Sequence, residues 1–312
     1  MPDRVGFDIT TARTGFNTFP ERVGLDILSE RVGKQDPHKP EPARLVRIDP
    51  MVEDHWLFQF RFVEERLNRE FSYRPGQFVM LSVIGVGEAP ISISSSPTRP
   101  GMIELCVRRT GRVTDALYRL KENDLVGIRG PYGNGFNVDK LKGNDLLIIA
   151  GGLGMAPLRS LVWYVLDNRK DFGDINLMYG ARTSGDLLFK NEIDLLLNRK
   201  DIKCLLIVER VQYEHRVNWR GHTGLITDLF KHVEVNPKST YAAICGPPVM
   251  YKFVLQKLLE LEFSKDRILM SLERKMKCGI GKCAHCTIGY KYTCIHGPIF
   301  TYWDAMNLPE MI

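Results

Sequence analysis

Residues 146–157 read LLIIAGGLGMAP, an apolar run followed at once by three closely spaced glycines. The apolar residues 146–150 predict a strand that is buried on both faces of a parallel sheet. Met155, Ala156 and Pro157 open a helical pattern that continues to residue 168. We therefore expect a strand, a glycine turn and a helix, the unit from which parallel α/β sheets are built.

The turn contains Gly151, Gly152 and Gly154 and is suited to a phosphate. Glycines let a pyrophosphate approach the backbone, and the start of the helix presents free N–H groups and the positive end of its dipole. The spacing departs from G-x-G-x-x-G, so the turn alone fits a tight structural loop as well as a nucleotide site. The rest of the chain has to distinguish the two.

On the C-terminal side of this turn, strand and helix patterns alternate. Strands are predicted at residues 146–150, 175–179, 203–208 and 240–244, and helices at 156–168, 189–199, 223–232 and 248–261. This alternation indicates a parallel α/β nucleotide-binding domain over residues 138–272.

On the N-terminal side the pattern is that of an antiparallel β-barrel over residues 43–137. Short β-rich runs at 45–48, 55–62, 77–81 and 102–107 are separated by turn residues. One helix is predicted at 114–120, capped by Thr114. The turn from Gly111 to Thr114, together with the three hydroxyls in residues 89–95, forms a second candidate phosphate site. Two such sites in two domains indicate two nucleotide-containing ligands.

The last segment, residues 273–312, contains four cysteines: Cys278, Cys283, Cys286 and Cys294. The C-x₄-C-x₂-C spacing with a later fourth cysteine is that of a plant-type [2Fe-2S] centre. Glycines 279, 281 and 289 are expected to supply its tight or positive-φ turns. We expect this segment to wrap its cluster against the α/β domain.

Two other uses of these cysteines are open. Cys283 and Cys286 form half of a possible zinc site with His285 and His296 nearby, but no second close pair of cysteines exists elsewhere. Disulfides are disfavoured because nothing in the sequence suggests secretion. The spacing therefore favours an iron–sulfur cluster, through which single electrons enter or leave.

Residues 1–42 differ from the rest of the chain. An Arg-x-Gly-apolar pattern recurs every nine residues from Arg4 to Arg31, and Pro37, Pro40 and Pro42 close the segment as a stiff linker. These repeats are too short to bury a core. They are either a poorly ordered tail or an arm that becomes ordered on a partner subunit.

Composition and charge indicate the general class of protein. The chain has 312 residues, 44% of them hydrophobic, and a net charge of +6, which is ordinary for a soluble protein and demands neither nucleic acid nor a membrane surface. The longest apolar run, residues 146–158, is too short and too rich in glycine to span a bilayer. We expect a cytoplasmic protein.

The order of these motifs resembles the ferredoxin–NADP reductase superfamily over residues 43–312. The cysteine segment narrows the resemblance to the gamma (diaphorase) subunits of cytoplasmic NiFe sulfhydrogenases, and it is similar to the B subunit of anaerobic sulfite reductase. The electron-transfer subunit of dihydroorotate dehydrogenase is a more distant relative. The resemblance implies a barrel that binds flavin and an α/β domain that binds NAD(P).

The flavin motif of the superfamily, Arg-x-Tyr-Ser, falls on Ala89, Pro90, Ile91 and Ser92, of which only the serine matches. The resemblance implies that Ser92 hydrogen-bonds near the flavin N5, without the usual arginine contact to phosphate and the usual tyrosine stack. Three further residues match the pyrophosphate turn, which favours FAD: Gly111, Val113 and Thr114.

The nucleotide site is implied in the same way. The matching positions are Gly151, Gly152, Gly154, Met155, Pro157, Arg182, Cys245, Gly246 and Pro247. The family places Cys245 beside the nicotinamide ring, so Ser92 and Cys245 are the predicted catalytic residues. Glu209 and Arg210 fall where the family reads the ribose 2′ position, and the glutamate favours NAD slightly over NADP.

The resemblance thus implies an electron-transfer subunit that exchanges hydride with NAD(P)H and passes single electrons through FAD and a [2Fe-2S] cluster to partner subunits, most simply a NiFe hydrogenase. Two alternatives remain at this point: an NADH-linked subunit of a sulfite reductase, and a structural subunit with a zinc knuckle.

Overall fold

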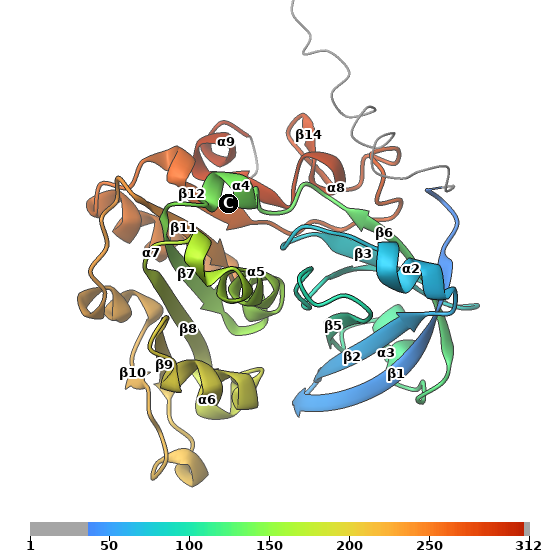
Figure 1. Ribbon diagram of the computed structural model, residues 1–312, viewed down its shortest axis with the longest axis horizontal. Helices are drawn as coiled ribbons and strands as arrows, with labels where there is room; N and C mark the ends of the chain where they lie inside the picture. Colours follow the sequence, from blue (N-terminus) through green and yellow to red (C-terminus); the bar gives the residue numbers. More distant parts are fainter. Residues whose placement is uncertain (1–36, 309–312) are drawn as a thin grey trace, which may run out of the picture. The chain divides into compact units, whose positions relative to one another are not determined.

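The computed structural model describes residues 37–308, which lie in one unit of the chain and contain two sheets and a cysteine-rich segment (Figure 1). The predicted repeats in residues 1–36 lie outside the described residues. None of the helices between residues 37 and 308 has the length and apolar character that a bilayer crossing requires.

The first sheet is the predicted antiparallel barrel. Its six strands are in the order β4-β3-β6-β1-β2-β5. Their bounds are Glu41–Val52 for β1, His55–Phe62 for β2, Phe78–Val83 for β3, Gly87–Ser92 for β4, Ile103–Arg108 for β5 and Leu125–Tyr132 for β6. The chain after β4 closes the barrel, because Ser94 N donates to the Glu104 carbonyl on β5 at 2.8 Å.

Two details of the barrel prediction are wrong. A second helix, α2 (Glu65–Glu70), follows β2; its six residues are mostly charged and show no apolar period, and the buried Asn68 side chain ties it to the backbone of Phe62. The predicted helix, α3, runs over Arg112–Leu117, so Thr114 is its third residue and Gly111 is its N-cap. A short helix, α4 (Val138–Leu141), leads out of the barrel.

The second sheet has the order β10-β9-β8-β7-β11-β12-β15 and is parallel except for β15. Its strands are β7 (Asp145–Gly151), β8 (Ile175–Thr183), β9 (Lys203–Arg210), β10 (His222–Thr223), β11 (Thr240–Cys245), β12 (Ile268–Ser271) and β15 (Ile299–Thr301). The four predicted strands are therefore confirmed, and the parallel class with them.

Helices cover both faces of this sheet, as alternate residues of β7 show. Leu146 and Ile148 belong to the core beneath α5 (Met155–Asp167) and α6 (Lys190–Asn198), whereas Leu147 and Ile149 belong to the core beneath α7 (Pro248–Glu260). The helix predicted at 223–232 is instead a 3₁₀ helix, η5 (Ile226–His232). Short 3₁₀ turns complete the unit: η1 (Gly152–Gly154), η2 (Arg169–Asp171), η3 (Ser184–Asp186), η4 (Tyr213–His215) and η6 (Lys265–Arg267).

The cysteine segment lies between β12 and β15 and contains β13 (Thr287–Ile288), β14 (Lys291–Tyr292) and α8 (Thr293–His296); α9 (Tyr302–Met306) follows β15. Ile288 of β13, together with β15 and α9, packs in the core of the α/β domain. Three of the cysteines, Cys278, Cys286 and Cys294, instead pack on the barrel against Phe78, Met80 and Tyr132, where the loop lies beside β3 and β6 (Figure 1). The expected position against the α/β domain is therefore confirmed for Ile288 and wrong for these cysteines.

Gly279 shows why the loop can lie so close to the barrel. Its φ is +76°, and a Cβ there would lie 3.0 Å from Met80 Cγ. Gly281 and Gly289 have φ values of +72° and +54°, so the expectation of positive-φ turns is confirmed at all three positions.

Candidate functional site

The predicted flavin strand β4 lies at the edge of the barrel sheet and pairs with β3. Ser92 is opposite Phe78, and Pro90 is opposite Met80. Side chains that face one another across two strands point to the same side. Since Val79 and Leu81 fill the barrel core, Ser92 and Pro90 lie on the outer face together with Phe78 and Met80. The other two predicted residues of this strand, Ala89 and Ile91, pair with the core residues Leu81 and Val79.

The predicted pyrophosphate turn is held together by Thr114. Its hydroxyl oxygen accepts hydrogen bonds from the backbone N–H groups of Thr110 and Gly111, at 2.9 and 3.0 Å, and donates to the Gly111 carbonyl. Nothing lies within 4 Å of where a Cβ on Gly111 would be. The turn is therefore built internally by Thr114 and is open on the side of Gly111.

Arg112 and Val113 connect this turn to the flavin strand. The Arg112 guanidinium lies 3.6 Å, and the Val113 side chain 3.5 Å, from the position of a Cβ on Gly87, the first residue of β4. Arg112 is exposed. Arg112 supplies the positive charge beside the turn that Ala89 cannot supply. The predicted site does not include Arg112, although this residue lies inside the predicted turn.

In the α/β domain the glycine turn after β7 is packed tightly against the end of β11. A Cβ on Gly154 would lie 2.2 Å from the Cys245 carbonyl oxygen, and one on Gly151 would lie 2.5 Å from Met250 Sδ. Gly152 differs, with a φ of +52° and open space around it, and its carbonyl accepts from the Tyr179 hydroxyl. Gly152 is thus the glycine of this turn that leaves room for a ligand. Gly154 and Met155 begin the helical part of the loop, and Pro157 lies buried in the first turn of α5.

Cys245 ends β11 beside this turn and is buried, which raises the pKa of its thiol to about 12. The hydroxyl of Tyr251 donates to the Ser271 and Ile244 carbonyls and fixes the strand end. Gly246 approaches Gly151 closely, since a Cβ on Gly246 would lie 3.2 Å from the Gly151 Cα. Pro247 is the N-cap of α7.

Glu273, which sequence reasoning missed, lies close enough to Cys245 to influence its ionisation. Glu273 is exposed at the surface, and desolvation by the neighbouring protein atoms raises the pKa of its carboxyl group. It is the first residue of the cysteine segment, so only the return of the chain from β12 brings it to the end of β11. No local sequence pattern could have revealed it.

The residues predicted to contact the ribose lie at the ends of adjacent strands. Arg182 is near the end of β8, Glu209 and Arg210 end β9, and Thr183 pairs with Arg210 across the two strands. All three charged side chains are exposed. The structure therefore brings two cations and one anion to the same sheet edge.

The four cysteines meet in one loop, where backbone N–H groups point at sulfur. Cys278 Sγ accepts from the N–H groups of Ile280, Lys282 and Cys283 at 3.4–3.5 Å, and Cys294 Sγ accepts from Gly281 N at 3.1 Å. Such donors stabilise negative charge on sulfur, which an iron-bound thiolate carries. The loop thus fits a site for thiolates.

The cysteines form an inner and an outer pair. Cys286 and Cys294 are buried with their sulfurs 3.3 Å apart, whereas Cys278 and Cys283 are partly exposed. The hydrogen bond between the two sulfurs lowers the pKa of Cys286 to about 6 and raises that of Cys294. Backbone donors, first that of His285, lower the pKa of Cys283. Within residues 37–308 no three His, Cys, Asp or Glu side chains converge on the position of a single metal ion.

A turn that sequence reasoning passed over, GPYGNGF at residues 130–136, joins the cysteine segment to the barrel. Gly133 N donates to the Cys294 carbonyl at 3.2 Å, and Asn134 N donates to the Gly297 carbonyl at 2.6 Å. From the barrel side, Gln77 Nε2 donates to the Gly133 carbonyl at 2.6 Å. The turn therefore fixes the inner cysteines relative to β3.

A buried arginine, Arg159 on α5, joins the barrel to the α/β domain. Its guanidinium pairs with Glu104 of β5 at 2.6 Å and with Glu192 of α6 at 2.7 Å, and it donates to the Ser94 carbonyl at 2.9 Å. Ser94 follows the flavin strand by two residues, and α5 begins at the nucleotide turn. Arg159 thus connects the two predicted ligand sites through three short bonds.

Three family models match the chain: an oxidoreductase FAD-binding domain at residues 42–136, an oxidoreductase NAD-binding domain at 148–256, and the iron-sulfur cluster binding domain of dihydroorotate dehydrogenase B at 273–305. Two similar proteins are the gamma subunits of sulfhydrogenases 2 and 1 of Pyrococcus furiosus. The first is 43% identical over 89% of this chain and all of its own length, and the second is 44% identical over 89% and 96%.

The chain belongs to the sulfhydrogenase gamma subunit family. A related protein of P. furiosus, a probable dihydroorotate dehydrogenase B (NAD(+)) electron transfer subunit, is 34% identical over 82% of this chain and 91% of its own. The expected resemblance is therefore confirmed, and with it a flavin-dependent NAD(P)H oxidoreductase that has an iron–sulfur site. These matches favour an iron–sulfur site and a redox role over the zinc knuckle and the purely structural role.

Solved structures agree on the fold. The structure titled for an NADH-dependent reduced ferredoxin-NADP oxidoreductase has a TM-score of 0.65, at 24% identity over 87% of this chain and 90% of that chain. A ferredoxin NADP+ reductase from Neisseria gonorrhoeae has a TM-score of 0.62, at 20% identity over 74% and 98%. At these identities the likeness extends to the fold alone.

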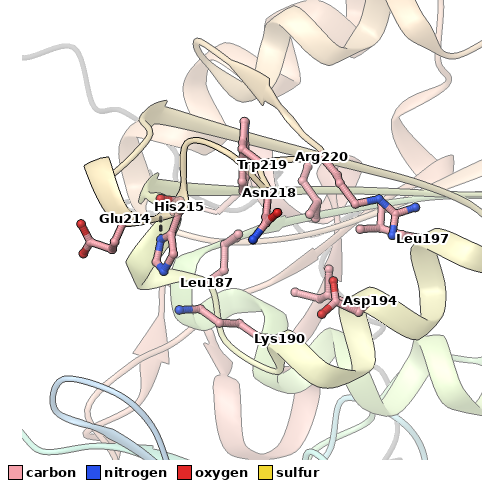
Figure 2. Close-up of a pocket in the computed structure, with 12 residues that line it drawn as sticks. Leu187, Lys190, Asp194, Leu197, Glu214, His215, Asn218, Trp219 and Arg220 are labelled. Carbon is pink, nitrogen blue, oxygen red and sulfur yellow. Dashed lines mark hydrogen bonds between the residues drawn. The ribbon is translucent and has the colours of Figure 1, made fainter.

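In this family member a cavity of about 190 Å³ lies away from the predicted site residues, none of which lines it. It is enclosed by α6 and the loop that carries Glu214, His215 and Trp219 (Figure 2). The Ser184 hydroxyl and His215 Nδ1 form a hydrogen bond of 2.9 Å at its edge. The predicted nucleotide turn therefore does not line this cavity.

Proposed function

We propose that this chain is the electron-transfer subunit of a NiFe hydrogenase complex, which oxidises or regenerates NAD(P)H and exchanges single electrons with its partner subunits. In such a protein FAD supplies a centre that takes a hydride and releases electrons one at a time, and a [2Fe-2S] cluster supplies a one-electron centre. The family relationship to sulfhydrogenase gamma subunits supports the hydrogenase partner.

One observation carries the proposal: Ser92 and the inner cysteines share one face of the barrel. Phe78 lies opposite Ser92 across two paired strands, and it belongs to the same apolar cluster as Met80, Cys286 and Cys294. Neighbouring strands are about 4.8 Å apart. The flavin strand and the inner cysteines are therefore separated by a single layer of packed side chains, which suits electron transfer between them.

FAD fits the barrel residues for two reasons. The space beside Gly111 is open, and the Thr114 hydroxyl keeps the turn in shape without using that space. Arg112 adds a positive charge next to it, which favours a pyrophosphate. The Ser92 hydroxyl lies on the outer face, where it can donate to or accept from a ring nitrogen.

A [2Fe-2S] cluster fits the cysteines better than a single metal ion does. Such a cluster needs two ligands for each of two irons, and the structure has an inner pair, Cys286 with Cys294, and an outer pair, Cys278 with Cys283. N–H donors point at the sulfurs of both pairs. We assign one iron to each pair.

Cys245 and Glu273 are the residues of this chain beside the nicotinamide position. The raised pKa of Cys245 keeps its thiol neutral near pH 7, so it packs as an uncharged wall. Glu273 is an acidic group close enough to raise that pKa further, and it can hold or release a proton there. Glu209 can accept from a ribose 2′-hydroxyl and repels a 2′-phosphate, so we propose NAD as the preferred nucleotide, although Arg182 and Arg210 lie at the same edge.

The partner is tested by purifying the full chain from its native source without oxygen and identifying what co-purifies. A NiFe subunit is the expected result. A sirohaem subunit would instead favour a sulfite reductase, and a dihydroorotate dehydrogenase subunit would favour the relationship seen at 34% identity.

The cofactors are tested on the same preparation. We expect one FAD, two irons and two sulfides per chain, and an EPR signal of a reduced two-iron cluster after NADH is added. A preparation that contains four irons, or no flavin, would contradict the proposal. All seven cysteines are free in the structure, which agrees with a reducing compartment, and we place the protein in the cytoplasm.

A further inference from the structure

Within the cysteine segment, the part that carries the four cysteines is basic. Residues 274–303 contain five lysines and arginines and no aspartate or glutamate, and the nearest acidic residues in the sequence are Glu273 and Asp304 on either side. Three of these, Lys275, Lys277 and Lys282, are exposed, and we call them the basic rim. Within residues 37–308 Lys275 and Lys277 form no ion pair, so no described carboxylate neutralises their charge.

The basic rim is on the same side as the outer cysteines. Cys278 and Cys283 are partly exposed, and Cys286 and Cys294 are buried against the barrel. Lys277 immediately precedes Cys278, and Lys282 immediately precedes Cys283. Electrons that leave the inner cysteines through the outer ones therefore reach the surface of the protein at the basic rim.

The remaining basic residues of the segment are used differently. Lys291 pairs with Asp304 at 2.8 Å and holds β14 to α9. Lys275 and Lys277 form no such ion pair with a described residue. The Lys282 ammonium contacts His38, and its side chain can be changed without removing the hydrogen bond from its backbone N–H to Cys278 Sγ. The rim is thus a charged surface whose side chains the local fold does not require.

The chain also enters the described structure at this place. The Pro37 carbonyl accepts from the Tyr132 hydroxyl at 2.8 Å and from Arg129, which in turn donates to the Cys278 carbonyl at 2.7 Å. Lys282 Nζ lies 3.1 Å from His38 Nε2. Residues 37 and 38 therefore belong to the same surface as the rim.

We propose that the basic rim docks an acidic surface of the protein that exchanges electrons with this chain. The proposal rests on the proposed function, because it takes the outer cysteines as the exit and entry point for electrons. Opposite charges on two surfaces speed their encounter and orient it, and the effect weakens as salt is added. A partner with acidic residues around its redox centre would thus place that centre against Cys283.

The test uses the full chain carrying FAD and its cluster, with a plant-type ferredoxin of net negative charge as the probe. The assay runs in the favourable direction: two molecules of reduced ferredoxin and one H⁺ convert each NAD⁺ to NADH. In the variant Lys275→Glu/Lys277→Glu/Lys282→Glu we expect kcat/KM for ferredoxin to fall at least about tenfold at low salt. The difference from the unchanged protein should shrink as ionic strength rises through about 0.15 M.

A matched control carries the same change of charge elsewhere: Lys170→Glu/Lys200→Glu/Lys231→Glu, three exposed lysines of the α/β domain. It should keep the activity of the unchanged protein with ferredoxin. Both variants should also keep NADH-dependent reduction of menadione, a small uncharged acceptor, and the EPR signal after NADH.

The outcomes separate the two proposals. Absence of the EPR signal and of menadione reduction in the unchanged protein would overturn the proposed function. With both present, an equal loss in rim and control variants, or a loss in the rim variant that salt does not alter, would overturn the docking proposal alone. Binding of the rim to anionic lipid vesicles or DNA in preference to ferredoxin, at about 0.15 M ionic strength, would overturn it too.

Discussion

The two predicted nucleotide turns look alike in sequence but are built differently. The turn after β7 is tight because chain packs on chain: Gly154 leaves no room for a Cβ beside the Cys245 carbonyl. The turn before α3 is open at Gly111 and is shaped by a side chain, Thr114. A glycine near a phosphate site can therefore serve the packing of the protein or the access of the ligand, and only the surroundings distinguish the two.

The largest expected effect concerns the connection between the two turns. Arg159→Met leaves the carboxylates of Glu104 and Glu192 without their buried partner, which typically costs about 3–5 kcal/mol. We expect a lower midpoint of urea unfolding and a loss of hydride transfer from NADH, because the domains that hold the two ligands are no longer fixed together. Stopped-flow measurement of flavin reduction would report the second effect.

Arg99→Met is the control for that change. Arg99 pairs with Asp167 across the same two domains, but its side chain is 48% exposed, and exposed pairs contribute about 0–1 kcal/mol. If Arg99→Met and Arg159→Met had equal effects on unfolding, the argument from burial would be wrong.

The next effect tests the packed turn. Gly154→Ala places a methyl group against the backbone of β11, which cannot move without breaking the sheet, and overpacking of this kind costs about 1–3 kcal/mol. We expect lower thermal stability of the ligand-free protein together with weaker NADH binding, measured by calorimetry.

Gly152→Ala tests the same packing argument. The added methyl group has no atom within 4 Å, so the expected loss of stability is that of an alanine with a positive φ, about 1 kcal/mol. It should affect NADH binding more than stability. A larger loss of stability in Gly152→Ala than in Gly154→Ala would reverse our assignment of the two glycines.

A smaller effect is expected at the open turn. Thr114→Val removes the acceptor for two backbone N–H groups and should cost about 1–2 kcal/mol. The FAD content of the purified protein should fall, because the turn loses its shape. Thr114→Ser retains the hydroxyl and should retain FAD; loss of FAD in both variants would show that the methyl group, not the hydrogen bonds, holds the turn.

The smallest expected effect is that of Gly111→Ala. Its backbone is extended, with a φ of −176°, and its surroundings are open, so the ligand-free protein should change by less than about 0.5 kcal/mol. The dissociation constant for FAD, measured by fluorescence quenching, should nevertheless rise. An unchanged dissociation constant would mean that the pyrophosphate lies elsewhere.

Much of the fold could be predicted because it is written in local patterns. The strands β2, β7, β8 and β11 can be predicted to within four residues at each end, since a buried strand needs a run of apolar residues. Helix α2 was missed because its residues are polar, and η5 was given the wrong type because its spacing differs little from that of an α-helix.

The site residues likewise divide into those that local sequence patterns predict and those that they do not. The glycine turns and the cysteine spacing are properties of short stretches, so Gly151, Thr114 and Cys278 could be chosen from the sequence. Arg159 and Glu273 could not, because their partners are far away along the chain: 55 residues separate Arg159 from Glu104.

By itself, the sequence determined the two domain types, the phosphate turns and the ligands of a cluster, because each depends on residues within one or two turns of chain. The tertiary structure decided that Cys278, Cys286 and Cys294 pack on the barrel, while Ile288 of the same segment packs in the core of the α/β domain. That choice depends on the fit of Gly279 against Met80 and on the hydrogen bonds from Gly133 and Asn134, contacts between segments more than 150 residues apart in the chain. The same packing buries Cys286 and Cys294 and leaves Cys278 and Cys283 beside the basic rim.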